Sequence, residues 1–360
     1  MKTLLVSGKF LSQSMTGVQR YAAGIVAGWD KGLHDGWIDR SRFAIRIIAP
    51  HTLLQPSIYE YIPVERCVTD GRLWEQVELP WRTRGGLLFS PYAAAPLFKI
   101  RHAVTIHDAA SAASSDQYSW AFRIYCYVVF RALGVTCNPI FTVSDFSRHE
   151  LQRYFSIDSD KIKVVSPGCD HLLRTEADAS ILARAGLMPG RFILGVSSLS
   201  KVKNFEGLAK AWEMLERPDV QLVIAGRSHD ALFRSASENI GHNVIRLGYV
   251  TDAQLRCLYE NAALFAYPSF YEGFGIPPLE AMSCGCPVVV ARQPALQESC
   301  SDAALYCDPA DVADIARQLR RILDDPQLAE RLRELGHIRA AEFTAARSAQ
   351  RLWSELVPFL

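Results

Sequence analysis

Residues 264–291 read LFAYPSFYEGFGIPPLEAMSCGCPVVVA. The apolar runs at the two ends of this stretch, Leu264–Tyr267 and Pro287–Ala291, predict strands that are buried on both faces. We expect a helix between them, because Pro277 suits the first turn of a helix and Gly285 suits the residue just after its end. The stretch therefore predicts a strand, a loop, a helix and a second strand in series, which is the repeating unit of a parallel α/β sheet.

Two carboxylates mark the start of this helix. Glu272 is expected in the loop before it and Glu280 on its first turn, while Gly273 removes a side chain where the backbone turns or approaches a ligand. A helix N-terminus carries roughly +0.5 of an elementary charge and favours a phosphate. The backbone there also offers N–H groups to sugar hydroxyls or phosphate, from Phe274, Gly275 and Ile276. The stretch therefore suits hydroxyl-rich groups on either side of a diphosphate.

Similar apolar runs recur along the whole chain. They cover residues 3–7, 43–49, 87–90, 103–107, 140–144 and 162–166 in the first half, and residues 192–197, 220–225, 244–247 and 304–307 in the second. Most lack the alternation of half-exposed strands, as expected of parallel strands covered by helices on both faces. We therefore predict two doubly wound α/β sheets in series.

The boundary between the two sheets is expected between Pro167 and Gly190, where Pro-Gly pairs interrupt the pattern. Amphipathic helices follow the second sheet, at residues 311–323, 327–341 and about 345–357, and the last of them carries Leu352, Trp353 and Leu356 on one side. We assign residues 1–170 to a first domain, 171–342 to a second, and 343–360 to a C-terminal helix that packs back on the first.

The composition excludes several classes of protein. The chain has 360 residues, 49% of them apolar and 21% charged, with a net charge of +1, so nothing global points to nucleic acid. No run reaches the roughly 18 apolar residues of a membrane-spanning helix. The nine cysteines include no Cys-x-x-Cys pair and no neighbouring His cluster. We therefore expect reduced thiols and a cytoplasmic protein.

The string from Glu272 to Glu280 has the form of the Glu-x7-Glu motif of glycosyltransferase family 4, and the chain resembles that family. The resemblance covers nearly the whole length of the chain. The resemblance implies the GT-B fold, with two Rossmann-like domains whose parallel sheets face each other across a cleft. It implies that Glu272 holds the transferred sugar and that Glu280 holds the ribose of the nucleotide. A surface helix with a solvated glutamate is the alternative interpretation.

Two positions in the first half resemble the family in the expected order. Gly17, in the stretch Thr16–Tyr21, would lie near the leaving phosphate, unless it only joins a strand to a helix. His107 follows a strand and would contact the donor sugar, although an isolated His is more often structural. Ser144 is expected to be a helix N-cap, which is a structural role.

The phosphate loop departs from the family pattern. Lys203 matches the diphosphate-binding lysine, with a solvated lysine at a helix start as the alternative. The arginine that accompanies it in the family has no counterpart, because Ser197 or Ser198 falls at its place. Arg227 is the candidate that would supply the charge instead. The acidic triplet 158–160 has the Asp-x-Asp form, but we assign it to a turn and expect no metal and no cofactor.

The resemblance implies a retaining, metal-independent hexosyltransferase. The charge that grows on the leaving diphosphate would be met by Lys203, the helix N-terminus and backbone N–H groups, and the leaving phosphate would help to deprotonate the acceptor. The stretch Tyr249–Asp252, which contains Val250, looks most like bacterial enzymes that use GDP-linked mannose or rhamnose. The implied acceptor is a growing, lipid-linked surface glycan such as lipopolysaccharide.

A helix predicted at residues 118–131 is rich in aromatic residues and carries two arginines. It would either pack on its sheet, which we slightly favour, or contact the inner face of the cell membrane or a lipid-linked saccharide.

Other classes of function stay open. A GT-B sugar-nucleotide 2-epimerase would release a changed nucleotide sugar without any acceptor. A non-catalytic sugar-nucleotide-binding protein would not need Glu272, Glu280, Lys203 and His107 together. A dehydrogenase is disfavoured because Gly-x-Gly-x-x-Gly does not follow the first strand.

Overall fold

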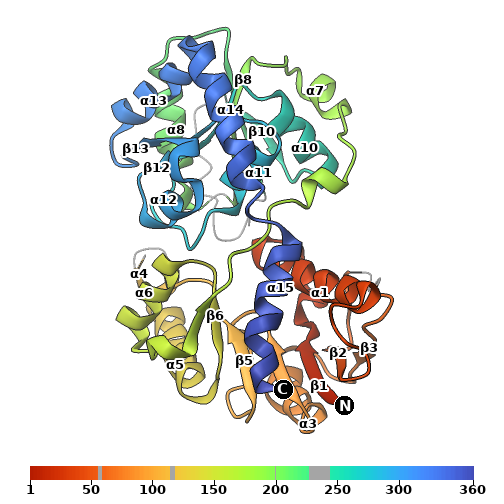
Figure 1. The fold of residues 1–360 in the computed structure, drawn as a ribbon. Coiled ribbons are helices and arrows are strands. Elements are labelled where there is room, and N and C mark those ends of the chain that lie inside the picture. Colours follow the sequence, from red (N-terminus) through yellow and green to blue (C-terminus); the bar gives the residue numbers. More distant parts are fainter. Residues whose placement is uncertain (56–58, 114–117, 199, 227–243) are drawn as a thin grey trace. The chain divides into compact units, whose positions relative to one another are not determined.

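The structure is a computed structural model of the chain, and it describes all residues except 56–58, 114–117, 199 and 227–243. The chain forms two compact units, each with its own parallel sheet (Figure 1). The first unit combines Met1–Gly168 with Ala345–Leu360, and the second is Cys169–Thr344.

The sheet of the first unit has seven strands in the order β3-β2-β1-β4-β5-β6-β7, and neighbouring strands run parallel. They are β1 (Lys2–Ser7), β2 (Phe43–Ala49), β3 (Val64–Arg66), β4 (Leu87–Ser90), β5 (His102–Thr105), β6 (Ile140–Thr142) and β7 (Ile162–Val164). Six of these were predicted as strands. The prediction missed β3, because a three-residue edge strand with two exposed residues has no apolar run to mark it.

The sheet of the second unit has the order β10-β9-β8-β11-β12-β13 and is also parallel. Its strands are β8 (Phe192–Val196), β9 (Gln221–Ala225), β10 (Ile245–Gly248), β11 (Leu264–Tyr267), β12 (Val288–Ala291) and β13 (Ala304–Cys307). All six lie at predicted positions, because continuous apolar runs are what two-sided burial requires.

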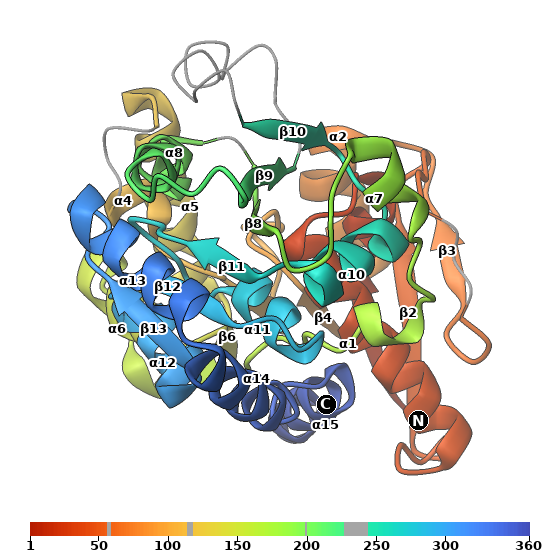
Figure 2. The same ribbon diagram turned by 90° about the horizontal axis from the view of Figure 1, so that it is seen from above.

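Helices cover both sheets. The first unit has α1 (Gly17–Asp35), α4 (Ala110–Ala113), α5 (Trp120–Thr136), α6 (Asp145–Phe155) and the helical segment made of α2 (Gly71–Leu73), η2 (Trp74–Glu78) and α3 (Leu79–Arg82). The second has α7 (Ser180–Ala185), α8 (Phe205–Glu213), α10 (Asp252–Asn261), α11 (Ile276–Ser283), α12 (Pro294–Cys300), α13 (Val312–Asp324) and α14 (Pro326–Ala340). Figure 2 shows α8 and α13 on one side of the second sheet and α10 and α11 on the other.

Local capping follows the sequence. The Ser144 hydroxyl caps α6 by accepting a hydrogen bond from the Ser147 N–H, as predicted. In the turn before β7, the Asp158 carboxylate accepts from the Asp160 N–H, which agrees with the assignment of this acidic triplet to a turn.

The last helix, α15 (Ala345–Leu356), packs on α1 and completes the core of the first unit. The Trp29 indole N–H of α1 donates to the Ala349 carbonyl over 2.9 Å, and the rings of Trp29 and Trp353 meet edge to face. Leu352 and Leu356 are fully buried in the same core. The predicted return of the C-terminal helix to the first domain is therefore confirmed.

Two glycines of α1 differ in how closely α15 approaches them. A Cβ added at Gly28 would lie 2.3 Å from the Ala349 Cβ, whereas one at Gly24 would meet the Ala345 Cβ at an ordinary 3.5 Å. We expect Gly28→Ala to destabilise the first unit by about 1–3 kcal/mol through overpacking. The matched change Gly24→Ala should be neutral or stabilise by up to about 1 kcal/mol, because alanine favours a helix. Urea unfolding of both variants tests this, and equal stability would contradict the packing.

Candidate active site

The stretch that opened the sequence analysis folds as predicted, with a loop between β11 and α11 and a turn before β12. Gly275 is the N-cap of α11 at φ +93°, and a Cβ there would lie 2.4 Å from the Leu296 Cδ2, so only glycine fits. Because the helix begins at Ile276, Glu280 is its fifth residue. Its predicted place on the first turn was therefore wrong, since Glu280 starts the second turn.

The end of α11 is also set by a glycine. Gly285 lies at φ +74° and its N–H donates to the Met282 carbonyl over 3.0 Å, while the Cys286 N–H donates to Ala281 over 2.9 Å. This is the hydrogen-bond pattern of a Schellman cap, so the predicted stop at Gly285 is confirmed.

A lysine and a glutamate meet beside the start of α11. The Lys203 Nζ lies 2.7 Å from the Glu272 Oε1 and donates to the Tyr267 hydroxyl over 3.2 Å. The side chains of Lys203 and Glu272 are only 18% and 10% exposed. Burial is the largest single influence and would lower the pKa of Lys203, but the Glu272 charge, the Tyr267 hydroxyl and the hydrogen bonds to both together raise it. Lys203 is therefore held as a cation near neutral pH.

Backbone contacts hold this pair in register. Lys203 ends a short 3-10 turn, η6 (Lys201–Lys203), and Asn204 follows in the left-handed region at φ 55° as the N-cap of α8. The Val202 carbonyl accepts hydrogen bonds from the Phe270 N–H over 2.8 Å and from the Ser269 hydroxyl over 3.1 Å. The loop that carries Glu272 is thus tied to the turn that carries Lys203, although the two are far apart in sequence.

Glu280 has a separate set of partners. The buried Tyr259 hydroxyl donates to its Oε2 over 3.3 Å, and the His171 Nε2 lies 3.4 Å from its Oε1. Burial raises the pKa of Tyr259, so its phenol stays protonated and is a donor to the carboxylate. Glu280 is itself 5% exposed. Its carboxylate is therefore oriented from two sides.

The residues between the two glutamates present backbone N–H groups, and not side chains, as possible hydrogen-bond donors to a ligand. The Phe274 ring is buried edge to face against Phe343, 5.4 Å between centroids, so it faces the interior of the second unit. The backbone N–H groups of Gly273, Gly275 and Ile276 belong to the segment that leads into the positive end of α11.

His107 lies in the first unit, two residues beyond the carboxyl end of β5. Its Nε2 is 3.1 Å from the Pro91 carbonyl and its ring meets Tyr21 edge to face. Burial lowers the pKa of His107 to about 4 despite that hydrogen bond. The imidazole is therefore neutral at pH 7, with the proton on Nε2 and an acceptor at Nδ1.

Among the described residues, the other predicted positions form no hydrogen bond or ion pair with Lys203 or the two glutamates. Gly17 is the first residue of α1 in the first unit, and Ser198 is exposed after β8 in the second. Val250 is buried just before the capping box of α10. Arg227, the candidate for the second phosphate-binding charge, lies outside the described residues. The roles proposed for these four residues stay predictions.

Three side chains around the glutamates were not predicted. Tyr267 is the last residue of β11, so its place at a strand end was a usable signal. Tyr259 on α10 and His171 before η5 (Leu172–Arg174) carry no motif, and only the tertiary structure brings them to Glu280.

Comparison with known proteins agrees with this geometry. Residues 186–338, all within the second unit, match the family described as "Glycosyl transferases group 1". The chain is 37% identical over 215 residues to the O-antigen chain mannosyltransferase B of Escherichia coli, in a match that spans 57% of this chain and 56% of that relative. It is 25% identical over 251 residues to the O-antigen chain mannosyltransferase RfbU of Salmonella typhimurium, spanning 68% of this chain and 67% of that one.

Among solved structures, Anabaena HepE in complex with UDP and glucose is similar, with a TM-score of 0.77 and 16% identity over 99% of this chain and all of that one. This likeness supports the fold, and the GT-B expectation of two Rossmann-like domains is confirmed. The chain spans only about half the length of its Escherichia coli relative, so the activity is argued separately below.

The lowered pKa of His107 predicts that the free energy of unfolding falls as the pH is lowered. An unfolded His, with a pKa near 6.5, binds a proton more tightly than the folded one, so His107 should destabilise the fold as pH drops from about 6.5 toward 4. Buried His102, with its pKa lowered to about 3, acts in the same sense. We expect the His107 ring resonances in NMR spectra to stay constant between pH 5.5 and 8. A midpoint near 6.5 would contradict the buried environment.

Proposed function

We propose that this chain, which belongs to the group 1 glycosyl transferases through residues 186–338, transfers a sugar from a nucleoside diphosphate sugar to a hydroxyl group with retention of configuration. The observation that carries the proposal is the Lys203–Glu272 pair beside the N-terminus of α11. It combines a cation and a helix end for a diphosphate with a carboxylate for sugar hydroxyls.

The hydrogen-bond capacity of Lys203 suits this role. An ammonium has three donors, and the two contacts to Glu272 and Tyr267 leave one for a phosphate oxygen. When a diphosphate binds, one of its oxygens pairs with the Lys203 ammonium. Glu272 is then less tightly bound to the lysine and accepts hydrogen bonds from the sugar hydroxyls. Lys203 and the start of α11 then stabilise the negative charge that grows on the leaving diphosphate.

Glu280 would receive the ribose. Tyr259 occupies one of its oxygens with a hydrogen bond and the His171 Nε2 lies near the other, and a carboxylate has about four acceptor sites, so positions remain for the two ribose hydroxyls. His107, neutral and with an acceptor at Nδ1, would contact the reacting sugar. The acceptor hydroxyl would lose its proton to the leaving phosphate, so the scheme requires no carboxylate base.

The donor we propose is GDP-mannose, with a GDP-linked deoxyhexose such as rhamnose as the second choice. The support is the naming of the relatives, two of which are mannosyltransferases of O-antigen chains. The acceptor we propose is the growing glycan on a lipid carrier. The alternatives are a 2-epimerase and a pure binding protein, and no contact among the described residues favours either.

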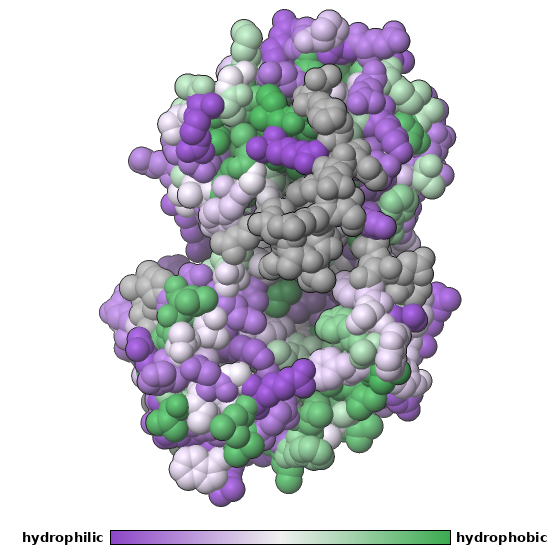
Figure 3. All heavy atoms as spheres, turned by 180° about the vertical axis from the view of Figure 1, so that it is seen from behind, coloured by the Kyte–Doolittle hydropathy of each residue, from purple (hydrophilic) through white to green (hydrophobic). Residues whose placement is uncertain are grey.

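Helix α5 suggests how such an enzyme would reach a lipid-linked acceptor. Only Cys126, Val129 and Leu133 of this helix are buried, whereas Trp120 is 74% and Val128 56% exposed. The predicted packing of this helix on its sheet agrees with Val129 and Leu133, which share a core with strands β5 and β6, while the outer face of the helix exposes apolar side chains. Figure 3 shows apolar side chains exposed over part of the first unit.

The charge of α5 fits an anionic lipid surface. The helix carries Arg123 and Arg131, both exposed, and no acidic residue, and Arg72 of α2 stacks on Tyr125. Aromatic and aliphatic side chains with flanking arginines are typical of helices that lie in a membrane interface. In the described part of the chain, no helix is both long and apolar enough to cross a membrane. Peripheral contact through α5 is therefore the arrangement that we propose.

The central assignment predicts that Glu272→Ala abolishes sugar transfer but keeps nucleoside diphosphate binding. Removing the carboxylate frees Lys203, so a diphosphate should stabilise the variant at least as much as the wild type. The measurement is the melting temperature with GDP, UDP, ADP and dTDP, where a ligand at a hundred times its Kd adds about 2.7 kcal/mol.

Glu330→Ala, which removes an exposed carboxylate on α14, is the matched control and should change neither binding nor turnover. Unchanged turnover in Glu272→Ala would contradict the site. A rise in melting temperature with UDP alone would support the proposed site but show that the donor carries uridine in place of guanosine.

The membrane proposal predicts that the protein sediments with vesicles of phosphatidylcholine and phosphatidylglycerol but not with phosphatidylcholine alone. Replacing Ile124 and Val128 by serine should reduce binding at least tenfold, because both side chains are exposed on α5. Ile338→Ser, an equally exposed apolar residue on α14, is the control and should bind as the wild type. Equal binding by the wild type, the variant with serine at positions 124 and 128, and Ile338→Ser would show that α5 is not the membrane contact.

A further inference from the structure

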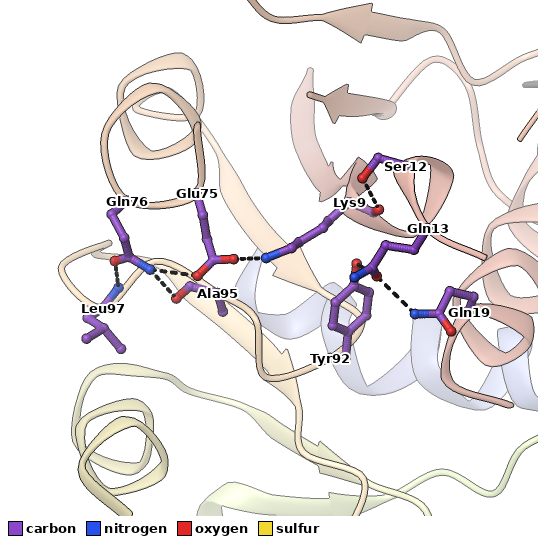
Figure 4. A network of polar contacts seen from close by, with 9 residues as sticks. All are labelled: Lys9, Ser12, Gln13, Gln19, Glu75, Gln76, Tyr92, Ala95 and Leu97. Carbon is purple, nitrogen blue, oxygen red and sulfur yellow. Dashed lines mark hydrogen bonds and ion pairs between the residues drawn. The ribbon is translucent and has the colours of Figure 1, made fainter. Parts of the chain in front are cut away.

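A second polar cluster lies in the first unit, where β1 and β4 end. Figure 4 shows the cluster, which draws side chains from η1 (Gly8–Ser12), the start of α1, the loop after β4, and η2. Its members are Lys9, Gln13, Gln19, Glu75, Gln76 and Tyr92. In parallel α/β sheets, ligands bind outside the carboxyl ends of the strands, so this cluster lies at the edge where a ligand is expected.

An ion pair forms the centre of the cluster. The Lys9 ammonium contacts the Glu75 carboxylate, and the Glu75 side chain is 5% exposed. Removing two charges from water costs several kcal/mol for each ion, and the pairing often fails to repay that cost. Burying this pair therefore adds little stability by itself, which is compatible with a role for the two charges in binding a ligand.

The backbone that carries Glu75 is unusual. Trp74–Glu78 form a π-helical turn between the short helices α2 and α3. Such turns are rare and occur frequently at functional sites. Next to Glu75, the Gln76 amide donates to the Glu75 Oε1 over 2.9 Å and to the Ala95 carbonyl over 3.0 Å. The turn thus fixes the carboxylate in place and ties it to the loop after β4.

Two side chains on the other flank orient the amide of Gln13. The Gln13 Oε1 accepts from the Tyr92 hydroxyl and from the Gln19 Nε2, both over 2.9 Å. This leaves the Gln13 Nε2 as a donor, and no described residue accepts from it. Lys9 likewise has three N–H groups and, among the described residues, a single side-chain partner, Glu75. The cluster therefore presents fixed donors next to a carboxylate with spare acceptor sites.

The cluster is joined to His107 within the same unit. His107 follows β5, the strand beside β4, and its Nε2 is hydrogen-bonded to the Pro91 carbonyl. Tyr92, the next residue, holds Gln13. A ligand on the cluster would therefore lie along the sheet edge that also carries His107.

We propose that Lys9, Gln13 and Glu75 form the subsite for the acceptor sugar, and that this subsite takes a neutral, hydroxyl-rich saccharide. The proposal rests on the proposed glycosyl transfer. Alternating donors and acceptors match the hydroxyls of a sugar. Because Glu75 already neutralises Lys9, a phosphate-bearing sugar finds no free cation and meets a carboxylate instead.

The test uses octyl α-mannoside as a neutral acceptor and its 6-phosphate as an anionic one, with GDP-mannose as the donor. Gln13→Ala and Glu75→Gln are expected to raise the KM for octyl α-mannoside about tenfold, the effect of one lost hydrogen bond. The KM for the donor and the slow hydrolysis of the donor by water should stay unchanged. Glu75→Gln should also lower the ratio of kcat/KM for the neutral acceptor to kcat/KM for the phosphorylated acceptor at least tenfold. The reason is that the substitution leaves the Lys9 charge unpaired and able to attract the phosphate.

Glu65→Gln is the matched control, because it breaks the exposed Arg46–Glu65 ion pair on β2 and β3. It should leave both acceptors unaffected. Unchanged acceptor KM in Gln13→Ala and Glu75→Gln, or an equal loss of donor hydrolysis, would overturn the subsite.

A direct binding measurement separates this proposal from the proposed function. Saturation-transfer NMR of octyl α-mannoside reports binding without turnover, and a titration should give Gln13→Ala a Kd about tenfold higher than that of the wild type. If the wild type neither transfers nor hydrolyses any nucleotide sugar, the proposed function fails, while this titration still tests the subsite. Equal Kd values for wild type and Gln13→Ala would refute the subsite even in an active enzyme.

Discussion

The Lys203–Glu272 ion pair is the interaction on which the proposed site depends. Either charge alone would be expensive at this degree of burial, and removing one partner of a buried pair typically costs about 3–5 kcal/mol. The pair exists only because the loop before α11 and the turn before α8 share hydrogen bonds at Val202. Gly275 and Asn204, both in the left-handed region, allow the two segments to meet with their helices starting where they do. The fold therefore holds a cation and an anion next to each other, at the place where we propose that a diphosphate sugar binds.

The sequence was informative where a single segment determines the outcome. Continuous apolar runs located every strand of the second sheet. Pro277 located the start of α11 and Gly285 located its end. It was uninformative where contacts join distant segments. Nothing near Tyr259 or His171 indicates that they orient Glu280, and nothing in Gly71–Arg82 indicates a π-helical turn, because such a turn depends on the packing around it. The edge strand β3 escaped for the related reason that exposure removes the hydrophobic pattern.

The two units contribute differently to what is specific about this chain. The family match lies entirely in the second unit, which carries the two glutamates and Lys203. The first unit carries His107, the exposed face of α5 and the Lys9–Glu75 cluster. If the proposed donor site lies in the second unit and the proposed acceptor subsite in the first, a change confined to the first unit would alter the acceptor and leave the donor site intact.

Helix α15 makes the first unit discontinuous along the chain, since its core takes Ala349, Leu352, Trp353 and Leu356 from beyond the second unit. During synthesis the ribosome therefore completes the second unit before it delivers the helix that closes the first. Until then, the face of α1 that carries Trp29 has no partner and exposes apolar surface. The order of assembly is thus the reverse of the order of the sheets: the unit that begins first is finished last, and the second unit folds as an insertion within it.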